Sequence, residues 1–301
     1  MAPARTRIQE SGEYERTPVS TRVFGAILFG VVFLGTLIWG EIPFTVGISL
    51  FSAVGAAELY GMFEKKGIGL PVAALLGIAV SVAYVAFAQA RPLESFGYIT
   101  AALIFFSFLW FMLILRVARP TASVSMTVIA PLISGFCLSH LVLLRNAVDA
   151  ASPNKKGGLW LVLFLIVLIW IFDILAWAVG RKIGRHKMAP VLSPKKSWEG
   201  LIAGTVGALG ACVPLSLLIQ AILGKNKIPW FSPGVALVIS VLVCVLGPAG
   251  DLAESMIKRD FGVKDTGSII PGHGGIMDRF DSTIFTAPAV FYYLYLMVIK
   301  P

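Results

Sequence analysis

Apolar stretches long enough to cross a membrane recur along almost the whole of this 301-residue chain, and this pattern limits its fold more than any other feature. A helix needs roughly 20 apolar residues to span a hydrocarbon core of about 30 Å. Apolar residues make up 57% of the chain and charged residues only 14%. A globular core of this size cannot bury so many apolar side chains, so we expect most of them to face lipid. The chain is therefore predicted to be an all-α polytopic membrane protein.

Nine apolar runs are predicted to be transmembrane helices. They lie at about 23–40, 42–62, 69–90, 96–115, 123–144, 158–180, 200–223, 233–250 and 282–299. Most of the 25 lysines and arginines fall in alternate connections that begin with the N-terminal tail, which places this set in the cytoplasm. We therefore expect a cytoplasmic N-terminus, and we expect both unusually polar connections, 181–199 and 251–281, to face the cytosol.

The chain divides by composition into three parts. A polar cytoplasmic tail occupies 1–22, about five spans occupy 23–157, and about four spans with most of the polar residues occupy 158–301. The net charge of +9 is explained by orientation and by contact with anionic membrane lipids. Because the chain has no soluble basic domain, we expect no binding to nucleic acid.

The first polar group surrounds Asp173, which lies inside a predicted span. An ionisable residue at such a place is costly, so it pairs with a cation or faces a polar cavity. The segment "SPKKSWEG" (193–200) follows, and its Ser197 is suited to cap the next helix. Two lysines, Lys195 and Lys196, stand beside that helix start, where they suit a polyphosphate.

A second group lies after the run 233–250. If the helix continues past the membrane, Asp251, Ser255 and Lys258 stand at i, i+4 and i+7 on one face. A solvated end of an amphipathic helix would show the same pattern, so this spacing alone does not indicate a site.

The third group is "KDTGSIIPGHGGIMDRFDS" (264–282), where glycines allow the backbone to approach a ligand closely. Asp278 and Asp281 are predicted to share one face of the helix that enters the last span. One carboxylate near a helix start can be explained by the helix dipole, whereas two beside Arg279 and His273 are harder to explain in that way. His273 alone can also be a structural residue.

Together these segments offer carboxylates for a hard divalent cation, basic side chains for phosphate oxygens, and a flexible loop. Magnesium prefers few carboxylates together with substrate phosphates and water. The sequence contains no Walker A loop and no HExxH zinc motif. The residues therefore predict metal-assisted phosphoryl or nucleotidyl transfer at the cytosolic surface of a membrane.

The stretch "SMIKRDFGVKDTGSIIPGHGGIMDRFD" (255–281) resembles the signature of the phosphatidate cytidylyltransferase, or CDP-diacylglycerol synthase, family. "GDLAES" (250–255) and "SPKKSWEG" resemble two further motifs of that family. Phe172 stands where the family has Asn, which weakens any polar role there, and Trp177 stands where it has Tyr. The resemblance covers about 172–288.

The resemblance implies transfer of CMP from CTP to phosphatidic acid, giving CDP-diacylglycerol and pyrophosphate, with Mg²⁺ as cofactor and a second metal or monovalent cation left open. It implies Asp251, Asp278 and Asp281 as metal ligands. It implies catalytic roles for Asp251, Asp278, Asp281, Lys258, Arg259, Lys264, Asp265, His273 and Ser255. It implies substrate contacts for Lys195, Lys196, Ser197, Arg279, Gly274, Gly275, Asp173 and Glu199.

By the same resemblance we expect a bacterial inner-membrane enzyme of phospholipid biosynthesis that forms a homodimer. A transporter or lipid flippase, with Asp173 as its coupling site, would instead show inverted repeats, and no repeat stands out in the sequence. A CTP-dependent lipid kinase, or a cytidylyltransferase for another lipid phosphate, remains an alternative. The acyl-chain preference is not predicted.

Overall fold

Helices account for nearly all of the structure, a computed structural model that describes residues 18–67, 71–90, 94–113, 119–152, 156–272 and 274–299. The first four helices are α1 (Val19–Trp39), α2 (Glu41–Glu64), α3 (Pro71–Ala90) and α4 (Glu94–Leu113). Next comes a continuous helical segment formed by α5 (Pro120–Pro131), the π-helical segment η1 (Leu132–Cys137) and α6 (Leu138–Ala150). Of the predicted tail at 1–22, residues 1–17 lie outside the described residues, and α1 already begins at Val19.

The C-terminal part adds α7 (Gly157–Ile183), α8 (Trp198–Leu223), the 3₁₀ turn η2 (Lys225–Lys227) and α9 (Pro233–Asp260). It ends with the short helix α10 (Met277–Phe280), α11 (Thr283–Leu294) and the π-helical segment η3 (Tyr295–Ile299). Between α7 and α8 lies an antiparallel hairpin of β1 (Lys187–Ala189) and β2 (Ser193–Ser197). The sequence interpretation anticipated a polar connection there but no strands.

Seven helical segments of the described residues are long and apolar enough to cross a membrane. Two shorter apolar helices, Val23–Trp39 and Thr283–Ile299, correspond to the first and last predicted runs. The class of an all-α polytopic membrane protein is therefore confirmed. The count of nine spans and the orientation stay predictions.

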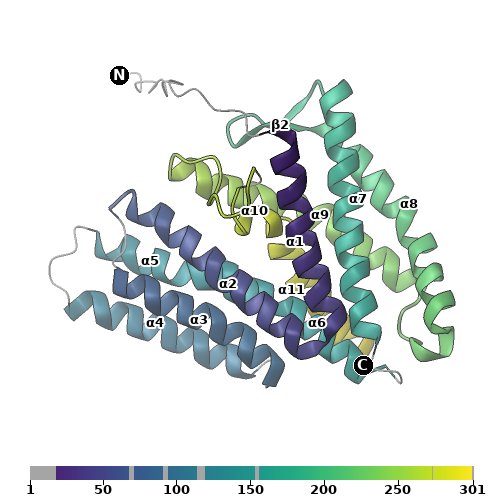
Figure 1. Ribbon diagram of the computed structural model, residues 1–301, viewed down its shortest axis with the longest axis horizontal. Coiled ribbons are helices and arrows are strands. Elements are labelled where there is room, and N and C mark those ends of the chain that lie inside the picture. Colours follow the sequence, from purple (N-terminus) through teal and green to yellow (C-terminus); the bar gives the residue numbers. More distant parts are fainter. Residues whose placement is uncertain are drawn as a thin grey trace.

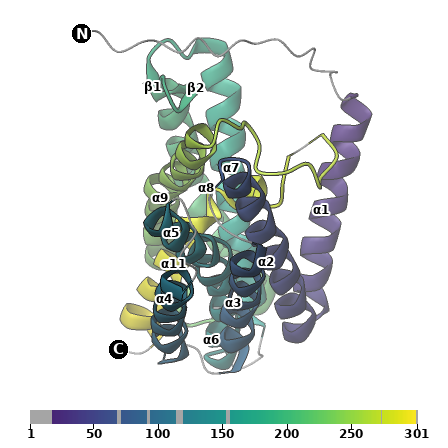
Figure 2. The same cartoon turned by 90° about the vertical axis from the view of Figure 1, so that its left-hand side faces the viewer.

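The helices are arranged so that the polar segments gather toward one end of the molecule. In Figure 1, α2 to α5 lie on the left, α7 and α8 on the right, and α9 to α11 between them. The β hairpin lies at the top in both views, whereas α6 lies near the bottom (Figures 1 and 2). The short helix α10 is on the hairpin side of the molecule (Figure 1).

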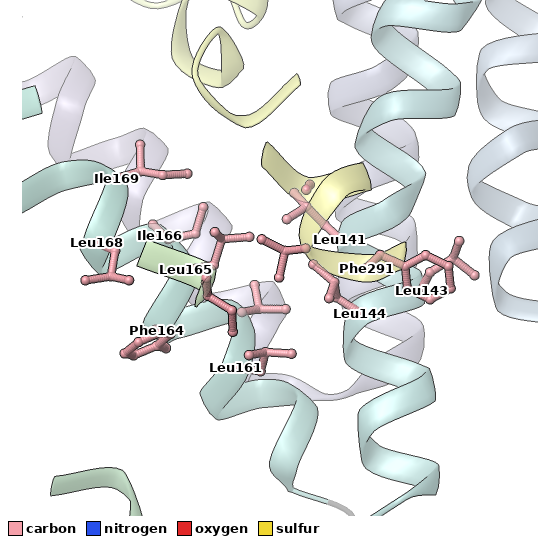
Figure 3. Close-up of a cluster of buried hydrophobic side chains, with 14 of the residues drawn as sticks. Leu141, Leu143, Leu144, Leu161, Phe164, Leu165, Ile166, Leu168, Ile169 and Phe291 are labelled. Carbon is pink, nitrogen blue, oxygen red and sulfur yellow. The ribbon is translucent and has the colours of Figure 1, made fainter. Parts of the chain in front are cut away.

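Apolar side chains of α6, α7 and α11 form the centre of the main core. Leu141 and Leu144 of α6 lie close to Leu165 of α7 and Phe291 of α11, and all four are almost fully buried (Figure 3). Inside lipid such contacts stabilise mainly through close packing, because the surrounding acyl chains are equally apolar. This core joins the N-terminal helices to the helices that carry the signature residues.

Glycines bring α8 against α7 at the end nearest the hairpin. A Cβ atom on Gly200 would lie 2.6 Å from the carbonyl oxygen of Ala176, and one on Gly204 would lie 2.8 Å from that of Phe172. Small residues at such contacts let helix backbones approach closely. The start of α8 and the lysines before it are therefore held beside the part of α7 that contains Asp173.

Candidate active site

One group of charged side chains, which we call the open cluster, gathers near the hairpin end from four segments of the chain. Its members are Asp173 of α7, Lys196 of β2, Asp251 of α9, Arg279 of α10 and Asp281. Asp173 and Arg279 are exposed and the other three are half-buried. Because the rest of the protein does not cover these side chains completely, a ligand can reach them.

The open cluster contains more acid than base. The Nζ atom of Lys196 lies 2.6 Å from Oδ2 of Asp251. The charges that act on Asp173 are Asp281, Asp251, Lys196 and Arg279. Three carboxylates and two basic groups thus share one region, which suits an added cation and an added phosphate.

Asp281 is placed in the cluster by the close approach of α9. A Cβ atom on Gly250 would collide with the carbonyl oxygen of Asp281, so only glycine allows this contact. The surrounding protein, and then the negative charge of Asp251, raise the pKa of Asp281 to about 6. The Ser282 amide donates to its Oδ1 atom at 2.6 Å, which partly stabilises the charged form.

A second group, which we call the buried network, consists of hydrogen-bonded polar side chains behind the cluster. Its members are Glu58, Glu254, Lys258, Thr266 and Asp278, each at most 8% exposed. Lys258 Nζ donates to Asp278 Oδ1 at 2.7 Å and to Glu254 Oε1 at 3.0 Å. The lysine charge is therefore neutralised inside the protein.

Asp278 is the centre of the buried network. Its Oδ2 atom accepts hydrogen bonds from the Thr266 amide (2.9 Å) and the Gly275 amide (2.8 Å). The Thr266 hydroxyl lies 2.9 Å from this oxygen and 3.0 Å from Glu58 Oε2, so the two carboxylates share its one hydrogen. Burial would raise the pKa of Asp278, but Lys258 and these donors outweigh it and lower the pKa. Both carboxylate oxygens are thus already bound by protein donors.

Glu58 joins this network from α2, in the N-terminal part of the chain. Its Oε1 atom accepts from the Ile276 amide at 2.9 Å, and its Oε2 atom accepts from the Met277 amide at 3.1 Å and shares the Thr266 hydroxyl, at 3.0 Å, with Asp278. The sequence interpretation missed this residue. A signal was present, because Glu58 is an acidic residue inside the apolar run 42–62, as Asp173 is in its own run.

The hairpin is fixed to its surroundings by three of the predicted residues. Ser197 caps α8 by accepting a hydrogen bond from the Gly200 amide at 3.2 Å, so the predicted cap is confirmed. Glu199 accepts from the His186 amide at 3.1 Å and lies 2.6 Å from its ring Nδ1. Arg259 Nε donates to the Leu192 carbonyl at 3.3 Å, which ties α9 to the hairpin.

The structure confirms one predicted helix and corrects another. The helix after the run 233–250 does continue, since α9 extends to Asp260 and carries Asp251, Ser255 and Lys258. The predicted acidic face of one helix entering the last span is wrong. Instead, α10 ends at Phe280 and α11 begins only at Thr283, and Asp278 and Asp281 belong to different groups.

The remaining predicted residues lie around these groups. Lys195, Lys264 and Asp265 are exposed, and the Ser255 hydroxyl lies 3.4 Å from Asp251 Oδ1. Gly274 has a positive φ of 79°, and a Cβ there would lie 2.6 Å from Asp278 Oδ2. His273 lies outside the described residues.

A metal site is not preformed in the part of the chain that the structure describes, where no three His, Cys, Asp or Glu side chains converge to hold an ion. The donor set nevertheless fits magnesium, because Asp251 and Asp281 act on each other electrostatically and Mg²⁺ takes few carboxylates alongside substrate phosphates. Asp278 would first have to release protein donors. The assignment of metal ligands stays a prediction.

Comparison with known proteins extends the similarity beyond the signature. Residues 20–297 match the model of a family described as the cytidylyltransferase family. A phosphatidate cytidylyltransferase of Bacillus subtilis is 32% identical over 276 residues, which cover 91% of this chain and 96% of the relative. Proteins of the same name from Synechocystis (29% identical, covering 92% and 97%) and Staphylococcus saprophyticus (30%, covering 90% and 96%) are also similar.

Proposed function

This chain belongs to the cytidylyltransferase family, and we infer from that membership that it transfers CMP from CTP to phosphatidic acid. The products are CDP-diacylglycerol and pyrophosphate, and the reaction belongs to phospholipid biosynthesis. The observation that carries this inference is the match to phosphatidate cytidylyltransferases along about nine-tenths of both chains. The polar residues of the family signature lie within residues 20–297, which match the family model, and they gather toward one end of an integral membrane protein.

The reaction requires alignment more than proton transfer. An oxygen of the lipid phosphate forms a bond to the α-phosphorus of CTP, and the bond between that phosphorus and pyrophosphate breaks. The second pKa of a phosphate monoester is about 6, so the attacking group is largely dianionic at neutral pH and needs no general base. The protein has to hold two anionic substrates in line and neutralise charge on the leaving group.

We assign these tasks to the open cluster. Lys196 and Arg279, with the exposed Lys195 nearby, are suited to bind the phosphates of the two substrates. Asp251 and Asp281 are proposed to hold Mg²⁺, with Asp173 beside them. When bound, Mg²⁺ would neutralise phosphate charge and help to orient the triphosphate. Asp278 is the third ligand predicted from the sequence, but in this structure its oxygens are engaged by Lys258, Thr266 and Gly275.

We further propose that the site faces the cytoplasm from the bacterial inner membrane and that the protein is a homodimer. The distribution of lysine and arginine supports the orientation, and the similar proteins named above are bacterial. Labelling of single cysteines introduced into the hairpin of intact cells would test the orientation. Light scattering of the purified protein would test the dimer.

The function is tested by incubating purified protein in detergent with labelled CTP, phosphatidic acid and a series of Mg²⁺ concentrations. We expect CDP-diacylglycerol and pyrophosphate only when Mg²⁺ is present. A lipid kinase would instead release CDP and leave a phosphorylated lipid, and a cytidylyltransferase for another lipid phosphate would prefer that substrate. Absence of product from folded wild-type protein would overturn the assignment. The same titration, repeated with K⁺ and Na⁺, tests for a second cation.

A further inference from the structure

We propose that Glu58 of α2 is a positioning residue for the reaction, because its carboxylate holds the signature loop (residues 264–272 and 274–276) against the N-terminal helices. The inference rests on the proposed function, and it extends the site to a residue outside the segment that carries the family resemblance. Glu58 does not belong to the open cluster, so it acts through the backbone that precedes Asp278 and Asp281.

Hydrogen bonds are the first evidence. The two oxygens of Glu58 accept from the amides of Ile276 (2.9 Å) and Met277 (3.1 Å), and they share the hydroxyl of Thr266 (3.0 Å) with Asp278. These donors lie at both ends of the loop. Glu58 lies 208 positions before Thr266 in the chain, so this contact is a long-range clamp and not a local turn.

The glycines of the loop are the second evidence. A Cβ atom on Gly267 would lie 2.5 Å from Glu58 Oε1, and one on Gly275 would collide with Glu58 Oε2. The loop backbone therefore packs directly onto the carboxylate, and a larger side chain at either position would displace it. A carboxylate held by three donors cannot move aside without losing them.

The cost of burying Glu58 is the third observation. The residue is only 8% exposed and lies in a helix long and apolar enough to span a membrane. A buried carboxylate is costly unless hydrogen bonds or a cation compensate it. Among the described residues, the ion pairs of this region link Lys258 and Lys196 to other acids, and the donors to Glu58 all come from the loop and the start of α10.

These contacts have a consequence for the open cluster. The amides of Ile276 and Met277 immediately precede Asp278, and Asp281 follows Met277 by four residues. Fixing two consecutive amides leaves the next turn of backbone little freedom, so the direction of Asp281 is set in part by Glu58. The displacement of a catalytic group by about 1 Å can cost on the order of 100-fold in rate.

The decisive experiment compares Glu58→Gln with Glu64→Gln. Glu64 lies in the same helix but is exposed, so it provides the same substitution away from the buried contacts of Glu58. Hydrogen–deuterium exchange should rise in peptides covering 264–277 in the Glu58 variant alone. The kcat for CDP-diacylglycerol formation should fall roughly 10- to 100-fold. The KM for CTP should change less, because Lys195 and Lys196 lie on the hairpin and not on the loop.

A second pair of variants distinguishes loss of the loop contact from general misfolding. Thr266→Val removes the hydroxyl that Glu58 and Asp278 share, and Thr266→Ser retains it. We expect the serine variant to keep most of the activity, and we expect Glu58→Gln combined with Thr266→Val to lose less than the product of the two single losses, since coupled residues are not additive.

The positioning role would be overturned if peptides covering 264–277 exchanged hydrogen in the Glu58→Gln variant at the wild-type rate. It would also be overturned if exchange rose equally over all helices. Wild-type protein that forms no CDP-diacylglycerol would overturn the proposed function instead. In that case the exchange comparison would still decide whether Glu58 holds the loop.

Discussion

The open cluster and the buried network meet on α9, where Asp251 lies three residues before Glu254 and seven before Lys258, and they use the same residue types in opposite ways. In the buried network, each oxygen of Asp278 already accepts hydrogen bonds from protein donors. In the open cluster, Asp251 and Asp281 repel each other and remain accessible. A carboxylate saturated by protein donors stabilises the fold. Asp251 and Asp281 have partners of their own in Lys196 and the Ser282 amide, but each also faces the negative charge of the other, which suits them to bind a cation from outside.

The two regions also differ in the elements that form them. The open cluster draws on α7, the hairpin, α9 and α10, all in the C-terminal part of the chain. The buried network needs α2, because Glu58 supplies acceptors that the signature loop would otherwise lack. The N-terminal helices therefore do more than anchor the protein in the membrane, since they hold the loop from behind.

The largest effect should come from Asp281→Asn, which should reduce activity on the order of 100-fold or more, about 2.7 kcal/mol in the barrier. The variant should remain folded, because it removes a carboxylate that its surroundings disfavour in the charged form. Initial rates over a Mg²⁺ titration, together with thermal unfolding, would measure both effects. Asp260→Asn, at the exposed end of α9, is the matched control. An active Asp281→Asn variant with unchanged Mg²⁺ dependence would remove the distinction between the two regions.

Asp278→Asn should differ from Asp281→Asn in that its primary defect is a loss of folding stability rather than a loss of activity. It leaves the buried Lys258 without one of its two carboxylates, and breaking a buried ion pair typically costs about 3–5 kcal/mol. Thermal or denaturant unfolding in detergent would measure this loss. If the variant unfolds like the wild type but needs far more Mg²⁺, then Asp278 binds the metal, as predicted from the sequence, and the network contacts rearrange on binding.

Unfolding curves measured over a series of pH values in metal-free buffer would further distinguish the open cluster from the buried network. The pKa of Asp281 is raised from 3.8 to about 6, so the folded protein binds this proton more tightly than the unfolded chain does. The stability contributed by the proton is present below about pH 4 and is lost as the pH rises through about 6. Wild type should therefore gain more stability than Asp281→Asn between pH 7 and pH 5. Parallel unfolding curves for the two proteins would contradict the raised pKa.

The smallest effect should come from Ser197→Ala. Loss of the cap of α8 should cost about 1 kcal/mol and should loosen the hairpin strand that carries Lys196. We expect a modest rise in the KM for CTP, because the cap lies next to Lys196 of the open cluster. We expect no change in hydrogen exchange of the signature loop, which belongs to the buried network. Increased exchange in the loop would show that the two regions are mechanically coupled.

Local sequence patterns predicted the helices and the segments of the site well. The apolar runs marked the membrane helices because apolar length is a property of contiguous residues, and Ser197 was identifiable as a cap from its neighbours alone. The continuation of α9 past Asp251 was only a condition of the sequence interpretation, and the structure supplies it.

Contacts between distant segments could not be predicted in the same way. Asp278 and Asp281 are identical residues three positions apart, and their roles are separated by the Lys258 ammonium and the amides of Thr266 and Gly275, all of which bind Asp278. Glu58 reaches its partners across more than 200 residues. The short hairpin strands are stabilised by their pairing and by contacts to α7, α8 and α9 rather than by a strand-like sequence pattern.

The length of α9 determines the depth in the membrane at which the protein meets its lipid substrate. Its 28 residues make a helix about 42 Å long at roughly 1.5 Å per residue, some 12 Å more than a hydrocarbon core of about 30 Å. An upright α9 that starts at one interface therefore carries its last two turns at the depth of the headgroups on the other side. A phospholipid already presents its phosphate at that depth. The acceptor substrate can consequently arrive by lateral diffusion within its leaflet, without being extracted from the bilayer, while the nucleotide arrives from solution.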